Sequence, residues 1–281
     1  MSSPTGPASP NVDDRPTEVV VISHSSLFYW WPVWAVGYLM AALTYLSGYH
    51  VAFVPAGTVA QRGAHVKGID GPRDVLIVPA DRSLRTDPES GELEPMRLRM
   101  TPNNDLGIIW GLVLCLVVIV TNVPLRGMWS FIVIVVLVFG TILLAVLGLW
   151  DRIIDTIRVV DIHLTGYSYL IISTFLFAVW LIAFLFLDRM IYMVFTRGQL
   201  RVRMAISQGE QVYDTRGMVV ERHRDDLFRH WLLGFGSGDL TVRVGGSSQQ
   251  QLELPNILSI ASKMRLIQTM LQEREVVRAS R

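Results

Sequence analysis

Cysteine is almost absent from this chain of 281 residues, which has one, Cys115. A single thiol excludes an intrachain disulfide and a cysteine-rich metal cluster. Charge is also scarce: Asp, Glu, Lys and Arg make up only 17% of the residues, against about 25% in soluble globular proteins. Because apolar residues make up 51%, we expect neither an ordinary cytosolic domain nor a disordered chain.

Four long stretches without charge account for this composition. Three of them have 20 to 24 uncharged residues and lie at 106–125, 127–150 and 164–187. A fourth, at 27–49, carries tyrosine or tryptophan at both ends, as expected of side chains in the two headgroup layers. About 20 apolar residues cross the hydrocarbon of a bilayer, and none of the stretches has the polar stripe of a soluble helix. The sequence therefore predicts four transmembrane helices.

A cleavable signal peptide is the alternative interpretation of the first span. It fits poorly, because the polar stretch before the span has one basic residue, Arg15, and three acidic ones, whereas signal peptides begin with basic residues. Four retained spans place both termini on one side of the membrane. Arg126 and the arginines after the last span favour a cytoplasmic side, but basic residues near the other span ends almost balance them.

The segments outside the spans differ in character. Residues 1–18 contain four prolines and few bulky apolar side chains, so we expect a disordered N-terminal tail. Residues 50–105 form an extramembrane loop, in which a strand at 75–78 and a returning strand at 94–100 predict a small hairpin. Residues 151–166 combine apolar and charged side chains at helical spacing, which is typical of an amphipathic helix in the membrane interface.

Residues 191–281 consist of short segments with alternating polar and apolar positions, separated by glycine. This pattern is typical of a small antiparallel β domain. A helix is expected at its end, with Asn256 as N-cap. The apolar face of this helix consists of Ile257, Ile260, Ala261, Met264, Ile267 and Leu271. The expected organisation is a tail over 1–18, a four-span region over 19–190 and a β domain over 191–281.

The stretch 192–271 resembles the bacterial pleckstrin-homology-like domain of membrane proteins. The resemblance lies in a Thr-x-x-x-Leu opening at 196–200, a Leu-Gly-x-Gly turn at 233–236 and a terminal helix at 257–271. It implies that this chain is an α-helical polytopic membrane protein with a small antiparallel β-barrel or sandwich at its C-terminus, closed by an α-helix. It also implies a place at the cytoplasmic face, without a defined activity. We therefore expect a bacterial inner-membrane protein with both termini in the cytoplasm.

Motifs of known chemistry are missing from the sequence. It has no glycine-rich phosphate loop with lysine, no His-Glu-x-x-His zinc signature and no Gly-x-Ser-x-Gly nucleophile elbow. No Asp, Glu, Lys or Arg lies within a predicted span, which argues against a pump or a proton-coupled transporter. We therefore expect no enzymatic activity, no catalytic residue, no cofactor and no bound metal.

Three polar features leave alternatives open. Asn122 either joins an intramembrane polar site or caps the turn that follows it. An acidic cluster is either a divalent-cation site or the solvated face of an interfacial helix, and it consists of Asp151, Asp155, Asp161 and His163. The run 222–231 either meets phosphates at the headgroup layer or forms a turn that fills the mouth of the barrel with Phe228, Trp231 and Leu232.

Basic side chains are concentrated towards the C-terminus. Residues 188–281 have 14 basic and 10 acidic side chains, whereas residues 1–187 have 11 and 14. Arg201 and Arg203 lie two apart on one predicted strand, so they share a face that is suited to anionic lipid. The competing interpretation pairs them with acidic residues of the same domain. The residues predicted to bind lipid or a partner are Arg201, Arg203, Arg222, Arg224 and Arg229.

Two functions are compatible with these features. The first is a non-enzymatic integral membrane scaffold or complex subunit, whose C-terminal domain binds a protein or an anionic lipid surface. The alternative is a transport or pore-forming subunit of a membrane oligomer. The expected partners are the lipid bilayer and either another protein or further copies of the chain, but not nucleic acid.

Overall fold

The computed structural model describes residues 18–87, 91–123, 127–160, 162–203, 209–223, 226–245 and 250–279. The chain forms two compact units. One comprises the residues up to 34 together with 113–151 and 175–281, and the other comprises 35–112 and 152–174. Of the predicted N-terminal tail, only Glu18 belongs to the described residues.

Four helices are long and apolar enough to cross a membrane. By length and composition, this confirms the predicted number of spans. They extend over Ser26–Ser47, Asp105–Asn122, Met128–Val146 and Gly166–Met190. The first consists of a 3-10 turn, η2 (Ser26–Trp30), and α1 (Trp31–Ser47). The next two are α2 and α3, and the last consists of α5 (Gly166–Ile182), η3 (Ala183–Leu187) and η4 (Asp188–Met190). Their length and composition indicate an integral membrane protein.

The C-terminal strands form two antiparallel sheets. The first has the order β1-β6-β7-β8 and consists of β1 (Glu18–Ile22), β6 (Tyr192–Thr196), β7 (Gln199–Arg203) and β8 (Gln211–Asp214). The second has the order β11-β10-β9 and consists of β9 (Val219–His223), β10 (Gly238–Val244) and β11 (Gln250–Ile257). The predicted antiparallel β structure is confirmed, but within the described residues neither sheet closes into a barrel.

Strand β1 comes from the opposite end of the chain. It pairs antiparallel with β6, and Val20 lies opposite Val194. Val19 and Val21 are buried, whereas Val20 is exposed, as expected of a strand with one face in a core. This pairing was not predicted, because the residues of β1 (EVVVI) do not alternate between polar and apolar, and they merge with the uncharged run that contains the first span.

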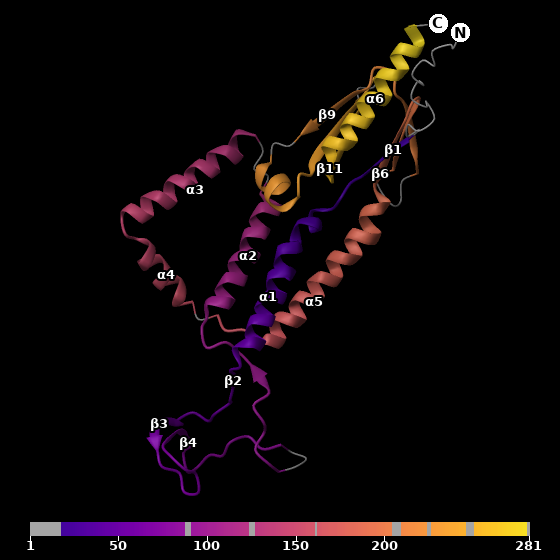
Figure 1. Ribbon diagram of the computed structural model, residues 1–281. Coiled ribbons are helices and arrows are strands. Elements are labelled where there is room, and N and C mark those ends of the chain that lie inside the picture. Colours follow the sequence, from indigo (N-terminus) through magenta and orange to yellow (C-terminus); the bar gives the residue numbers. More distant parts are fainter. Residues whose placement is uncertain are drawn as a thin grey trace, which may run out of the picture. The chain divides into compact units, whose positions relative to one another are not determined.

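The two sheets and helix α6 (Ile260–Ala279) share one apolar core (Figure 1). Leu200 of β7, Leu254 of β11 and Ile267 of α6 are all fully or almost fully buried in it. The predicted apolar face of the terminal helix is therefore found in part: Ile260, Met264, Ile267 and Leu271 lie on α6 and contribute to the core, whereas Ala261 is exposed and Ile257 lies in β11. The predicted N-cap is wrong, because Asn256 lies in β11 and the helix begins only at Ile260.

The second unit contains the loop between the first two spans. Strand β3 (Val59–Ala64) pairs with β4 (Arg73–Ile77), and β2 (His50–Val51) pairs with β5 (Leu98–Arg99). The strand predicted at 75–78 is thus found, but its partner precedes it in the sequence, so the pairing predicted with 94–100 is wrong. Eight residues separate β3 from β4, and the entropic cost of closing this loop is lower than for the longer loop to 94–100 by only about 0.6 kcal/mol. Helix α4 (Trp150–Arg158) covers only the first half of the segment 151–166 predicted to be an interfacial helix.

The position of β1 leads to a prediction about the isolated domain. Because Ile22 lies opposite Tyr192, a short turn of asparagine and glycine can replace residues 24–190. We expect this joined domain to be more stable than residues 191–281 alone, which lack Val19 and Val21. Burial of the two valines contributes about 3 kcal/mol or more. Thermal unfolding followed by circular dichroism tests this, and equal melting temperatures would contradict the role of β1.

Candidate functional site

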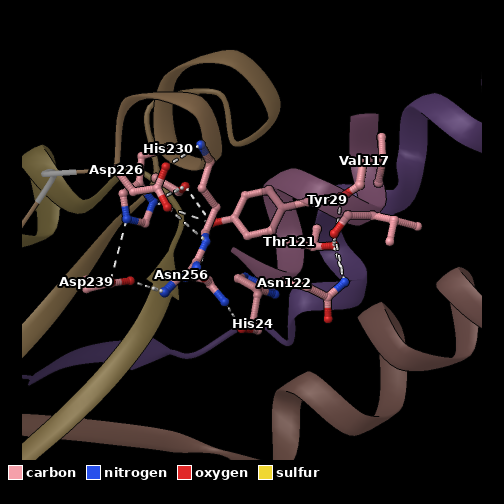
Figure 2. Close-up of polar contacts among 12 residues, drawn as sticks. His24, Tyr29, Val117, Thr121, Asn122, Asp226, His230, Asp239 and Asn256 are labelled. Carbon is pink, nitrogen blue, oxygen red and sulfur yellow. Dashed lines mark hydrogen bonds and ion pairs between the residues drawn. The ribbon is translucent and has the colours of Figure 1, made fainter. Parts of the chain in front are cut away.

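A cluster of polar side chains lies within the first unit, where the first span begins; we call Tyr29, His230, Ser237, Asp239 and Asn256 the polar hub. Tyr29 is fully buried, and its hydroxyl donates a hydrogen bond of 2.8 Å to Oδ1 of Asn256. Ser237 Oγ and His230 Nδ1 lie 3.1 and 3.4 Å from the same hydroxyl oxygen. Figure 2 shows the phenol of Tyr29 pointing towards His230 and Asn256. Tyr29 of the first span thus binds residues that lie more than 200 positions later in the sequence.

The local backbone places these side chains together. His230 belongs to a π-helical turn, η5 (Phe228–Leu233), and Ser237 immediately precedes β10. Asn256 has a positive φ of 57°, which asparagine adopts more readily than most residues. Gly234 has no room for a side chain, because a Cβ there would meet the Ser237 hydroxyl and lie 2.7 Å from the carbonyl oxygen of Arg229. Glycine at this position therefore allows η5 to approach Tyr29.

A second buried contact joins the segment before the first span to the end of the last one. Asp188 is 3% exposed, and its Oδ2 lies 3.0 Å from Nδ1 of His24. The backbone N–H of Ser25 donates to Oδ1 of the same carboxylate at 3.0 Å. Asn256 connects this contact to the polar hub, because its Nδ2 donates to the carbonyl oxygen of His24 at 2.9 Å. The start of the first span, the end of the last span and the β domain therefore share one network of polar contacts.

Asp239 carries the negative charge of the polar hub. Its Oδ1 accepts the backbone N–H of Asn256 at 2.9 Å, and its Oδ2 lies 3.6 Å from Nε2 of His230. Burial by itself would raise the pKa of this carboxyl. The His230 side chain, the Asn256 N–H and the nearby charges of His230 and Arg229 outweigh burial, so the pKa lies below its usual value.

This lowered pKa predicts a dependence of stability on pH. Because the folded-state pKa of Asp239 is below the unfolded value of about 3.9, the carboxylate stabilises the fold above that value and loses its contribution as pH falls through the folded pKa. We expect Asp239→Asn to lower the melting temperature at pH 7 and to flatten its decline in acid. The matched control is Asp81→Asn, since Asp81 is 80% exposed. Equal acid sensitivity of Asp239→Asn and the unaltered chain would contradict this role.

A cavity of about 340 Å³ lies beside the second sheet. Its lining is mainly polar and includes the carboxylates Glu221, Asp226, Asp239 and Glu253. One arginine, Arg243, lines it as well and donates to Glu221 at 3.1 Å. The excess of negative charge makes the cavity suitable for a cationic group. Among the residues that the structure describes, no three His, Cys, Asp or Glu side chains are placed to hold a metal ion, and Asp161 of the acidic cluster lies outside those residues.

The predicted arginines occupy different parts of the domain. Arg201 and Arg203 lie on β7 and alternate with the buried Leu200 and Val202, so they share the outward face of that strand. Arg222 lies on β9, and Arg224 is outside the described residues. Arg201 is half-exposed with its Nε 4.0 Å from Glu210 Oε1. This is one of the contacts expected if the arginines pair within the domain, but at half exposure it contributes little to stability.

Arg229 differs from the β7 arginines. Its side chain is 13% exposed, its Nε lies 3.5 Å from Asp226 Oδ2, and its backbone N–H donates to Asp226 Oδ1 at 3.0 Å. Asp226 itself is buried. The charge of Arg229 is therefore matched inside the domain.

Side-chain positions bear on two other sequence alternatives. Asn122 donates to the carbonyl oxygen of Val118 at 2.8 Å and to Thr121 Oγ1 at 3.3 Å, so its amide is bound within the last turn of its own helix, and Pro124 of the turn that it was predicted to cap lies outside the described residues. The interpretation in which Trp231 and Leu232 fill the mouth of a barrel is wrong. Trp231 is 74% exposed, and Leu232 is also exposed.

Comparisons of the chain with protein-family models, with curated proteins and with solved structures found no match. The function is therefore inferred from the residues and contacts described above.

Proposed function

We propose that the chain is a non-enzymatic integral membrane scaffold or complex subunit, whose C-terminal domain has the pleckstrin-homology-like fold and binds an anionic lipid surface or a protein. The observation that carries the proposal is the double attachment of this domain. Strand β6 follows the last span directly, while β1 and Tyr29 bring the start of the first span into the same unit. A domain that is attached at two points stays close to the membrane, as a scaffold requires, and contacts with the surface can then set its orientation.

The fold assignment is supported by the order of the elements. Six strands, β6 to β11, form antiparallel sheets and are followed by α6, which packs its apolar face on the common core. The inner-membrane location with both termini in the cytoplasm is part of the same proposal. The pairing of β1 with β6 supports the placement of both termini on one side, because both ends of the membrane region enter one sheet.

Anionic lipid is the partner that the arginines favour. Arg201 and Arg203 lie on β7, within 15 residues of the end of the last span at Met190. Their side chains share the outward face of the strand, so both can meet one surface. Each contributes on the order of 1 kcal/mol next to an anionic leaflet, and salt screens this contribution.

The test uses the full chain in nanodiscs of zwitterionic or anionic lipid, with a fluorophore on β8 and an acceptor dye on the lipid headgroups. We expect Arg201→Glu/Arg203→Glu to reduce energy transfer in anionic nanodiscs only, and high salt to have the same effect. The matched control is Arg216→Glu/Arg243→Glu, which makes the same charge change at arginines paired with Asp214 and Glu221. Equal transfer in both lipids would refute the anionic surface and leave a protein as the partner.

A further inference from the structure

Four large apolar side chains are exposed on η5 and the residues beside it. Trp231 and Phe235 are 74% and 72% exposed, and Leu227 and Leu232 are exposed as well. All four lie within nine residues, and Leu227 and Trp231 share a helical face. A soluble surface seldom carries so much apolar area in one place unless it binds a partner or a membrane.

Residues 233 and 235 of this segment contact Trp31, the first residue of α1. The indole N–H of Trp31 donates to the carbonyl oxygen of Leu233 at 3.0 Å, and the ring of Phe235 stacks on Trp31 with centroids 5.4 Å apart. Helix α1 has 17 residues and rises about 25 Å, so it fills most of the roughly 30 Å of hydrocarbon. Because η2 extends the first span by five residues before α1, Trp31 lies near the end of the span, close to where hydrocarbon meets headgroups, and Phe235 lies beside it.

The other side of the segment is polar and held in place. His230 contacts Tyr29 and Ser237, and Arg229 of the same turn pairs with the buried Asp226. Phe235 has a positive φ of 49°, a strained conformation for a residue with a side chain. Such strain persists only where surrounding contacts maintain it, and here it leaves the phenyl ring exposed.

We propose that residues 227–235 form an interfacial anchor, in which Leu227, Trp231, Leu232 and Phe235 enter the headgroup layer next to the first span. Tryptophan and phenylalanine favour this layer, where their rings leave water without entering the hydrocarbon core. The occupant of the patch is the bilayer, because one of its members, Phe235, stacks on Trp31 near the start of the first span. The anchor requires that α1 crosses a membrane, and it does not depend on the scaffold function or on the arginines of β7.

The experiment uses the full chain with Cys115→Ser, one chain per nanodisc, and a nitroxide attached at Trp231→Cys. Leu232→Cys is a second reporter, and Val219→Cys is the control, because Val219 is half-exposed on β9. We expect the labels at 231 and 232 to be several-fold less accessible to a water-soluble nickel chelate, and more accessible to oxygen, than the label at 219.

The anchor binds through apolar side chains, whereas the proposed function depends on arginines and anionic lipid, so the two tests can fail independently. The protection should be equal in zwitterionic and anionic lipid, should persist at high salt and should be unchanged by Arg201→Glu/Arg203→Glu. Nickel accessibility at 231 and 232 equal to that at 219 would overturn the anchor. Protection that arises only when two chains share a nanodisc would also overturn it, because the occupant would then be a second copy.

Discussion

Replacing Tyr29 with alanine is expected to lower the free energy of unfolding by about 3–5 kcal/mol, the range for loss of a large buried aromatic side chain. Tyr29 is fully buried, and its removal leaves a cavity beneath η5. It also leaves Asn256 Oδ1 without its hydroxyl donor. Since a domain is stable by only about 5–15 kcal/mol, much of the folded state should be lost in Tyr29→Ala.

The hydroxyl of Tyr29 can be tested separately from its ring. Tyr29→Phe keeps the packing but leaves buried polar atoms unsatisfied, which costs about 1–3 kcal/mol. The matched control is Tyr38→Phe, because Tyr38 belongs to the same span and its hydroxyl donates an exposed hydrogen bond of 3.1 Å to Thr174 Oγ1. Thermal unfolding of the three full-length variants in detergent measures the difference. Equal melting temperatures for Tyr29→Phe and Tyr38→Phe would show that the polar hub does not stabilise the protein.

The second large effect is expected at helix α6. Ile267 is 1% exposed in the core between the two sheets, so Ile267→Asp would bury a carboxylate without a partner. The cost is several kcal/mol, enough to detach the helix or unfold the domain. The neighbouring Leu266 is 44% exposed and provides a matched control in Leu266→Asp. Limited proteolysis should cut the C-terminal domain of Ile267→Asp rapidly and that of Leu266→Asp slowly, and similar cleavage rates would contradict the docking of α6.

The spans and the β character of the C-terminal part could be predicted because both signals are local. A run without charge identifies a span, and alternation over a few residues identifies a strand. The pairing of β1 with β6 could not be predicted in this way, since no spacing rule relates Val20 to Val194. The polar residues Ser23, His24 and Ser25, which interrupt the apolar run that starts at residue 19, are the sequence sign that partners hold this segment.

Asn256 and Trp231 show how local rules fail at the candidate site. Asparagine before an apolar helical pattern predicts an N-cap, but Asn256 lies in β11 and binds Tyr29 and His24, which only tertiary contacts bring near. Tryptophan near a β domain is expected to be largely buried in its core. In a membrane protein, however, an aromatic side chain can leave water by entering the bilayer, and the exposed Trp231 is two residues from Leu233, whose carbonyl oxygen accepts the indole N–H of Trp31 at the start of α1.

The central claim is that both ends of the membrane region enter one sheet, and a disulfide between β1 and β6 tests it most directly. Val20→Cys and Val194→Cys, in a chain with Cys115→Ser, place thiols at opposite positions of adjacent strands, where Cβ atoms are about 5 Å apart. Val20→Cys with Val212→Cys is the control, because β8 lies three positions from β1 in the sheet, about 14 Å away. After mild oxidation, the chain is cut at a protease site inserted between β3 and β4. The account predicts that the two fragments stay joined without reductant in the first variant and separate in the control. Separation in both variants would contradict it.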